Sequence, residues 1–143
     1  MRRLLFLVSV VALLVSACAS APNPTSGREV TVDGKSYQVI TVSQLKSALD
    51  KKDFLLLNVH VPYAGEIKGT DLFIPYTEIE KNLGKLPADK AAMIVVYCRS
   101  GQMSSIAAKT LTRLGYTNIR DVDGGMMEWE KEGYELIQAP LAR

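Results

Sequence analysis

The stretch "KAAMIVVYCRSGQMSSIAAKTLTRLGY", residues 90–116, carries the clearest structural signal in the chain. It starts as an apolar run that ends at Cys98, passes Gly101, and continues as a helix-like pattern up to Gly115. A continuously apolar run is typical of a strand that is buried on both faces, and glycine often follows the last turn of a helix. The stretch therefore predicts a strand, a short loop and a helix, with a thiol at the carboxyl end of the strand.

Segments with the same two patterns flank this unit. "DFLLLNVHV" (53–61) predicts a second buried strand, and "TNIRDVDGG" (117–125) predicts another strand followed by a turn. "TVSQLKSALDKK" (41–52) predicts a short helix with Ser43 as its N-cap. Because strands alternate with helices and are buried on both faces, the sequence predicts an α/β fold: an open parallel sheet with helices on both faces.

The remaining helical patterns are shorter. In the helix after Cys98, the residues expected on the buried face are Ile106, Ala107, Leu111 and Leu114. A helix is expected from about Thr77 to Leu83, with a break at Gly84 and Pro87. "MMEWEKEGYELI" (126–137) predicts a last helix with Trp129 turned inward.

Residues 29–40, "EVTVDGKSYQVI", allow two interpretations. Two alternating segments surround Asp33-Gly34, a pair that tight hairpin turns prefer. The same stretch is compatible with one peripheral turn before a first sheet strand at residues 37–40.

Composition limits the classes of protein that this chain can be. Its 143 residues suit one compact domain. Without Arg2 and Arg3, the 17 basic side chains fall to 15, which equals the 15 acidic ones. This balance argues against nucleic acid as a partner, because binding through counterion release needs a clustered basic surface.

The first residues, "MRRLLFLVSVVALLVSACASA", have a basic start, an apolar run and a small-residue end, which indicate an export signal. "VSAC", ending at Cys18, resembles the lipobox of bacterial lipoproteins, in which the cysteine is acylated and becomes the new N-terminus. We therefore expect a signal peptide over 1–17, a lipidated cysteine with a flexible tether over 18–28, and a folded domain over 29–143. Ordinary cleavage near residues 19–21 is the alternative. The lipobox resemblance implies a cell-envelope protein anchored by lipid, in the outer membrane facing the periplasm if the cell is Gram-negative.

If Cys18 is lipidated, Cys98 is the remaining thiol of the chain and has no disulfide partner. With one histidine, His60, and no second cysteine in the folded part, a zinc site of the usual ligands is not expected, and neither is another cofactor. A buried, inert thiol is one interpretation of Cys98. The other is a reactive thiol, because backbone amides of a glycine turn and a helix N-terminus stabilise a thiolate. On the second interpretation, Cys98 is expected to be exposed and to ionise easily.

Three stretches, "VVYCRSGQMSSIAA", "DVDGGMMEWEKEGY" and "GEIKGTDLFIPYTEI", resemble single-domain rhodaneses, which are sulfurtransferases. The resemblance covers roughly residues 37–137. It implies that Cys98 takes up a sulfane sulfur as a persulfide and passes it to a thiol or to cyanide. It also implies a substrate-binding loop made by the backbone of Arg99, Ser100, Gly101, Gln102, Met103 and Ser104.

The chain departs from the family pattern at three places. It has Asn58-Val59-His60 where Asp-Val-Arg is common, and Gly65-Glu66-Ile67 where Gly-His-Ile is frequent. Met103 stands where many relatives carry arginine, so the resemblance implies a less cationic pocket. An organic persulfide or a protein partner is then a more plausible sulfur donor than thiosulfate.

The sequence leaves other functions open. Phosphatase relatives of this fold need an arginine where this chain has Ser104, which argues against phosphate chemistry. His60 is a candidate accessory base near the thiol, or a histidine that only packs at a strand end. The main alternative to a sulfurtransferase is a non-catalytic rhodanese-fold module that binds an envelope protein or senses sulfur or oxidant.

Overall fold

In the computed structural model, which describes residues 27–138, the chain forms an α/β sandwich. The strands are β1 (Arg28–Val32), β2 (Lys35–Ile40), β3 (Leu55–Asn58), β4 (Leu72–Phe73), β5 (Ile94–Tyr97) and β6 (Ile119–Val122). The helices are α1 (Val42–Leu49), the 3₁₀ helix η1 (Glu80–Lys85), α2 (Gln102–Arg113) and α3 (Gly125–Lys131). The predicted signal peptide, Cys18 and most of the predicted tether lie outside the described residues.

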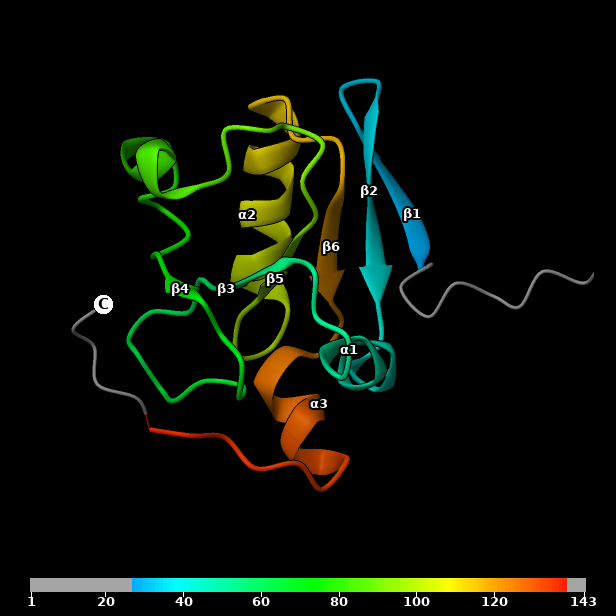
Figure 1. The fold of residues 1–143 in the computed structure, drawn as a ribbon, viewed down its shortest axis with the longest axis vertical. Coiled ribbons are helices and arrows are strands. Elements are labelled where there is room, and N and C mark those ends of the chain that lie inside the picture. The colour runs from blue at the N-terminus through cyan, green and yellow to red at the C-terminus, as the bar shows by residue number, and fades with distance from the viewer. Residues whose placement is uncertain (1–26, 139–143) are drawn as a thin grey trace, which may run out of the picture.

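The sheet has the order β1-β2-β6-β5-β3-β4, with β1 antiparallel to β2 and every other pairing parallel (Figure 1). The prediction of an open parallel sheet is confirmed, except that β1 at one edge runs antiparallel to β2. The hairpin interpretation of residues 29–40 is also confirmed, because Asp33 and Gly34 connect β1 to β2 with φ angles of 50° and 76°. Two successive positive φ values are what a type I′ turn requires.

Helices cover both faces of the sheet, as predicted. The core on one face contains the α2 residues Ala107, Ala108 and Leu111. The core on the other face contains Leu45 of α1 and Trp129 of α3. Figure 1 shows α2 alongside β5 and β6, while α1 and α3 lie together beyond the ends of β2 and β6.

Several local predictions are wrong. The N-cap of α1 is Thr41 rather than Ser43, because Thr41 forms a capping box: Oγ1 accepts from Gln44 N at 3.1 Å and Thr41 N donates to Gln44 Oε1 at 2.8 Å. Ser43 instead donates to Glu132 at 2.8 Å. Ile106 is 48% exposed rather than buried, because α2 turns Ala107 and Leu111 toward the sheet.

The remaining differences concern short elements. The helix expected over 77–83 is the 3₁₀ element η1, which begins later, continues through Gly84 and is distorted at Asn82. The two-residue strand β4 was not predicted, because two half-buried residues leave no periodic pattern. Gly115 follows α2 with φ 93°, as expected of a glycine after a helix end.

Candidate active site

Cys98 lies at the carboxyl edge of the sheet, directly after β5. β3 lies next to β5 in the sheet. After β3 the chain forms β4 on the side of β3 away from β5, and it then crosses back to form β5. Such a reversal of strand order is where open α/β sheets bind ligands. The loops after β3 and β5 therefore surround the position where a ligand site is expected.

Cys98 is buried, with 1% of its surface exposed. Its Sγ accepts a hydrogen bond from the Gly101 amide at 3.1 Å. The expectation of an exposed thiol is wrong, because Cys98 alternates in phase with Ile94 and Val96 and faces the core beneath α2. Within the described residues, one backbone amide, that of Gly101, donates a hydrogen bond to the sulfur.

The residues predicted as a loop over 99–104 divide into two parts. Arg99, Ser100 and Gly101 form the loop, and Gln102 already begins α2. Gly101 caps the helix with φ 93°, a left-handed conformation that favours glycine.

The side chains of these residues point in different directions. Arg99, Ser100 and Gln102 are exposed, whereas Met103 packs against the core and Ser104 is fully buried. Because α2 has twelve residues, its N-terminus supplies a positive dipole end next to Cys98. Positive charge at this point stabilises a thiolate or a persulfide anion relative to the neutral form.

The start of α3 holds the cysteine loop from the other side. Met126 N donates to Cys98 O at 2.9 Å, and Met127 N donates to Arg99 O at 2.9 Å. Gly125 makes this approach possible, because a Cβ at this position would lie 2.1 Å from Cys98 O. Both the turn and the close packing against the cysteine loop thus explain why glycine occupies the Gly124-Gly125 pair.

His60 lies on the loop after β3, and the positive charge of Arg99 acts on its imidazole. Burial lowers the pKa of the imidazole, and the Arg99 guanidinium lowers it further. Within the described residues, His60 Nδ1 is buried without a hydrogen-bond partner. The sequence-predicted accessory residue thus lies within electrostatic range of Arg99 in the cysteine loop.

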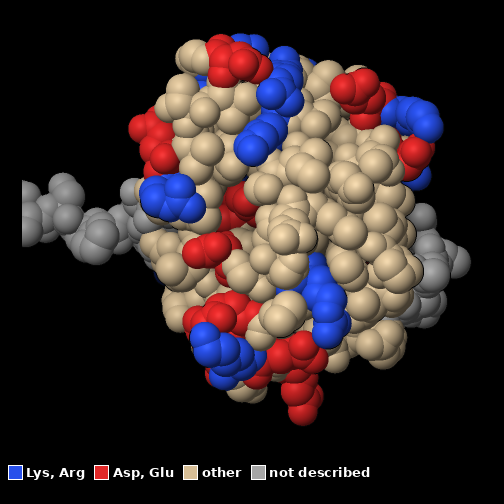
Figure 2. All heavy atoms as spheres, turned by 180° about the vertical axis from the view of Figure 1, so that it is seen from behind, with Lys and Arg blue, Asp and Glu red and all other residues tan. Residues whose placement is uncertain are grey.

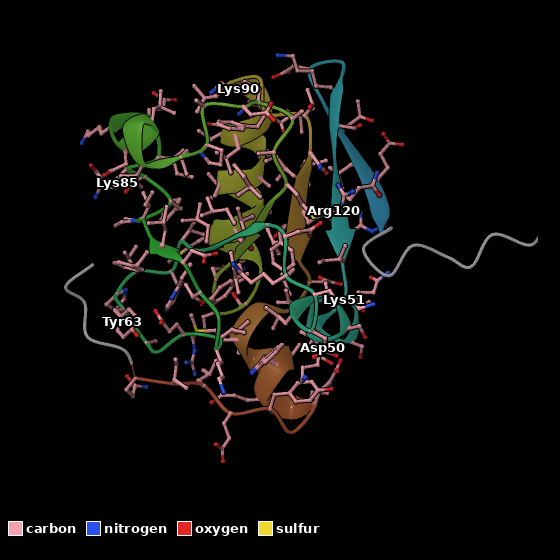
Figure 3. The ribbon with its side chains drawn as sticks, viewed as in Figure 1. Asp50, Lys51, Tyr63, Lys85, Lys90 and Arg120 are labelled. Carbon is pink, nitrogen blue, oxygen red and sulfur yellow. The ribbon has the colours of Figure 1, made fainter. Side chains whose placement is uncertain are left out.

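Asn58 braces this loop without a charge. Its Nδ2 donates to Gly65 O at 3.1 Å, and its Oδ1 accepts from His60 N at 3.0 Å. Figure 3 shows Tyr63 of the same loop on the β4 side of the molecule, with Lys90 at the top of the view. The Tyr63 ring meets the Phe73 ring edge-on, with centroids 5.5 Å apart.

Sequence reasoning missed Asp121, which lies on β6 beneath α2 and is 4% exposed. Burial raises the pKa of this carboxyl to about 7, whereas a hydrogen bond from Ser104 opposes the shift. A carboxylate next to Val122 in the short predicted strand "IRDV" was the signal that could have identified it.

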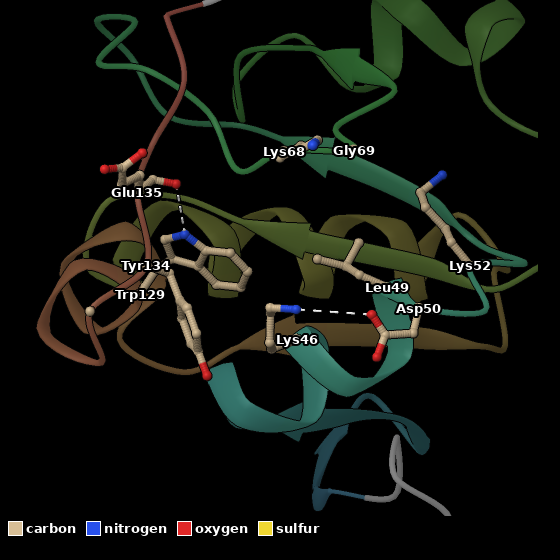
Figure 4. Close-up of a pocket in the computed structure, with 10 residues that line it drawn as sticks. Lys46, Leu49, Asp50, Lys52, Lys68, Gly69, Trp129, Tyr134 and Glu135 are labelled. Carbon is tan, nitrogen blue, oxygen red and sulfur yellow. Dashed lines mark hydrogen bonds and ion pairs between the residues drawn. The ribbon is translucent and has the colours of Figure 1, made fainter.

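A separate hollow of about 560 Å³ lies between α1 and α3 (Figure 4). Its lining includes Lys46, which pairs with Asp50 at 3.9 Å, and Trp129, whose Nε1 donates to Glu135 O at 3.1 Å. No residue of the cysteine loop lines this hollow. The candidate active site is therefore the surround of Cys98.

Charge is dispersed on the back of the molecule. Figure 2 shows Lys and Arg side chains set singly among acidic and uncharged residues on that face. Among residues 27–138, no three His, Cys, Asp or Glu side chains gather into a group that could hold a metal ion. Over the same range, every helix is too short or too polar to cross a bilayer.

Comparisons with known proteins identify the family of the domain. The rhodanese-like domain family matches residues 41–132. A sulfurtransferase of Allochromatium vinosum is 29% identical over 90 residues, which cover 62% of this chain and 82% of that protein. The thiosulfate sulfurtransferase GlpE of Pseudoalteromonas translucida is 26% identical over 110 residues, which cover 72% of this chain and 98% of that protein.

A solved structure gives the same answer for the fold. The crystal structure of a rhodanese-related protein from Thermoplasma volcanium superposes with a TM-score of 0.61 at 30% identity. The match covers 71% of this chain and 98% of that one. With the fold and the family match in agreement, the chain belongs to the rhodanese-like domain family.

Proposed function

We propose that this chain is a sulfurtransferase in which Cys98 carries a sulfane sulfur as a persulfide. The Cys98 thiolate attacks the sulfane sulfur of a donor, a new S–S bond forms, and the donor leaves as sulfite or as a thiolate. A thiol or cyanide then attacks the outer sulfur, so the cysteinyl S–S bond breaks and the Cys98 thiolate returns. The two steps balance without an external oxidant or reductant, and they require no metal.

The observation that carries the proposal is the contact between the Gly101 amide and Cys98 Sγ at the N-terminus of α2. Both the thiolate and the persulfide are anions, so the same amide and helix dipole favour each of them. The substrate-binding role belongs to the backbone of residues 99–104. His60, which is close to Arg99, is the accessory residue.

The donor class follows from the charges around the thiol. Met103 packs against the core and brings no charge, so Arg99 is the cationic side chain of the loop residues 99–104. Thiosulfate carries two negative charges, and an organic persulfide can carry one. We therefore favour an organic persulfide as donor, although thiosulfate is the substrate class in the name of the Pseudoalteromonas translucida relative.

Sulfur loading followed at the peptide that contains Cys98 tests the function. The full chain is incubated with glutathione persulfide or with thiosulfate and then with cyanide. Support is a mass increase of one sulfur on the Cys98 peptide, which cyanide removes as thiocyanate and which Cys98→Ala abolishes. If both donors leave the peptide unchanged while the chain remains folded, the sulfurtransferase proposal is wrong.

One observation favours a second function, a non-catalytic module that binds a partner or senses sulfur or oxidant. Cys98 is 1% exposed, so a donor must reach the sulfur through the loop that covers it. A sensor would load slowly and keep its sulfur, whereas an enzyme would release it to the acceptor on each cycle. Repeated turnover of cyanide to thiocyanate therefore separates the two functions.

We also propose that the chain is anchored at the cell envelope through lipid on Cys18. The support is the lipobox-like "VSAC" after the apolar run. Metabolic labelling with an alkyne fatty acid is expected to mark the parent and Cys98→Ala but not Cys18→Ala. Labelling that persists in Cys18→Ala would contradict the anchor.

A further inference from the structure

Asp121 and Cys98 face the same core from neighbouring strands. Asp121 pairs with Val96 across β5 and β6, and Cys98 lies two residues beyond Val96 on the same face. With strands about 4.8 Å apart and a rise of about 3.3 Å per residue, the two Cα atoms are separated by roughly 8 Å. A buried carboxyl thus lies close to the thiol, and the mechanism above does not use it.

A short chain of hydrogen bonds connects the two groups. Ser104 hydrogen-bonds the carboxyl of Asp121, and its Oγ donates to Gly101 O at 3.2 Å. The amide of the same Gly101 donates to Cys98 Sγ at 3.1 Å. Cys98 and Asp121 are 1% and 4% exposed and Ser104 is fully buried, so both ends of the chain are shielded from solvent.

The single proton of the Ser104 hydroxyl makes this connection depend on charge. When Ser104 donates to Gly101 O, it can only accept from Asp121, which requires a protonated carboxyl. When Asp121 is ionised, the hydroxyl proton is drawn to the carboxylate and Gly101 O loses this donor. The ionised carboxylate also competes with a thiolate for the positive end of α2.

We infer that Asp121 is a positioning residue for Cys98, which holds the Gly101 turn through Ser104 when protonated and opposes the Cys98 thiolate when ionised. The inference deepens the proposed function, on which it rests for the importance of a reactive Cys98. The carboxyl titrates in the relevant range, because burial raises its pKa to about 7. In the described structure its Oδ1 has no hydrogen-bond partner, so the site does not compensate an ionised form well.

Other charged groups around Asp121 contribute less to its pKa than burial does. Asp123 raises the pKa, whereas Arg28 of β1 and Lys109 of α2 lower it. Tyr37 of β2 faces the same region, and its own pKa is raised by burial and then by Asp121. Directly after β5, the titratable group on this face is Cys98 itself.

The test is the pH dependence of Cys98 alkylation by iodoacetamide, measured on the Cys98 peptide so that Cys18 is not counted. The parent is expected to show an inflection near pH 7 in addition to that of the thiol. Asp121→Asn should lose the lower inflection and react about fivefold faster above pH 7, as expected for removal of one nearby charge at an effective dielectric constant of a few tens. Ser104→Ala should shift the lower inflection to higher pH, because Ser104 lowers the Asp121 pKa.

The matched control is Asp123→Asn, which removes an exposed carboxylate from the end of the same strand. It should keep the lower inflection. Superimposable profiles of the parent and Asp121→Asn would overturn the inference, as would a ¹³C titration of the parent that places Asp121 below pH 5. Neither measurement depends on sulfur transfer. If sulfur loading fails but the inflection near pH 7 is present, the proposed function is rejected and the inference about Asp121 stands.

Discussion

Gly125 and Cys98 are packed so closely that a Cβ on residue 125 would lie 2.1 Å from the Cys98 carbonyl oxygen and 3.0 Å from its carbonyl carbon. The contact lets the first amides of α3 bond to the backbone of the cysteine loop. Two helices therefore fix the loop. α2 follows it directly in the sequence, and α3 comes later in the chain and packs against it. Persulfide chemistry on Cys98 would depend on both.

Gly125→Ala is expected to lower the free energy of unfolding by at least about 3 kcal/mol, because it adds a backbone clash to the cost of a left-handed conformation. Any folded fraction should load sulfur poorly at Cys98. Gly133→Ala is the matched control, since Gly133 also has positive φ, 87°, but nothing lies within 4 Å of a Cβ there. Urea unfolding and peptide mass spectrometry measure the two effects, and equal effects of the two variants would contradict the packing argument.

The burial of Cys98 predicts a strong dependence of its reaction on reagent size. In the folded chain, fluorescein maleimide should modify Cys98 at least about tenfold more slowly than N-ethylmaleimide, because the bulky reagent must wait for local opening. In urea the difference should largely disappear. Equal rates in the folded chain would mean that the thiol is open to solvent.

The sequence was sufficient to predict the βα unit around Cys98, since the apolar run and the helical pattern are each long enough to be unambiguous. Its prediction of thiol exposure was wrong, because exposure depends on which face of β5 carries residue 98 and on how α2 lies over it. Neither the face of β5 nor the position of α2 can be read from the residues next to Cys98 in the sequence. Asp121 escaped notice for a similar reason: its proximity to Ser104 arises from the pairing of β5 with β6 and from α2 above them.

Capping predictions failed at the level of single residues. Thr41 and Ser43 are both good N-cap residues, and propensity does not separate them. The choice is made by Gln44, whose side chain completes the capping box with Thr41. The three-residue spacing from Thr41 to Gln44 was readable from the sequence.

Thr41→Ala is expected to reduce the free energy of unfolding by about 1 kcal/mol, because α1 loses its capping box. Thr41→Ser should restore most of the loss. Ser43→Ala removes only an exposed bond to Glu132 and should change stability by less than about 0.5 kcal/mol. Chemical denaturation of the three variants checks the assignment, and a larger loss from Ser43→Ala than from Thr41→Ala would reverse it.

Asp121 should make the protein less stable as pH rises through the weakly acidic range. The folded pKa is about 7 and the ordinary value is 3.8, so between these values the folded state holds a proton that the unfolded state releases. The free energy of unfolding therefore falls as pH rises from 3.8 to about 7 and does not recover above it. Below pH 3.8 both states are protonated and the effect is absent.

Asp121→Asn removes this dependence. The free energy of unfolding of the variant minus that of the parent should increase by about 2 to 4 kcal/mol as pH rises from 4 to 8. Urea unfolding at the two pH values measures the gain, and Asp123→Asn serves as the control for a carboxylate that is exposed. A gain of the same size in both variants would show that net charge, rather than burial, causes the effect.

His60 offers a direct test of its contact with Arg99, because it is the one histidine of the sequence and gives a single imidazole signal. Burial and then Arg99 lower its pKa below the ordinary 6.5, so the apparent value from an NMR titration should lie below 6.5 in the parent. Between that value and 6.5 the unfolded state binds more protons, and stability rises with pH across this window. Arg99→Gln should raise the His60 pKa, because one nearby positive charge is removed. Arg113→Gln, whose guanidinium pairs with Asp33 at 2.8 Å, removes the same charge elsewhere and should leave the titration unchanged. If both variants shift the signal equally, Arg99 does not act on His60 at close range, and its role beside Cys98 would have to be reconsidered.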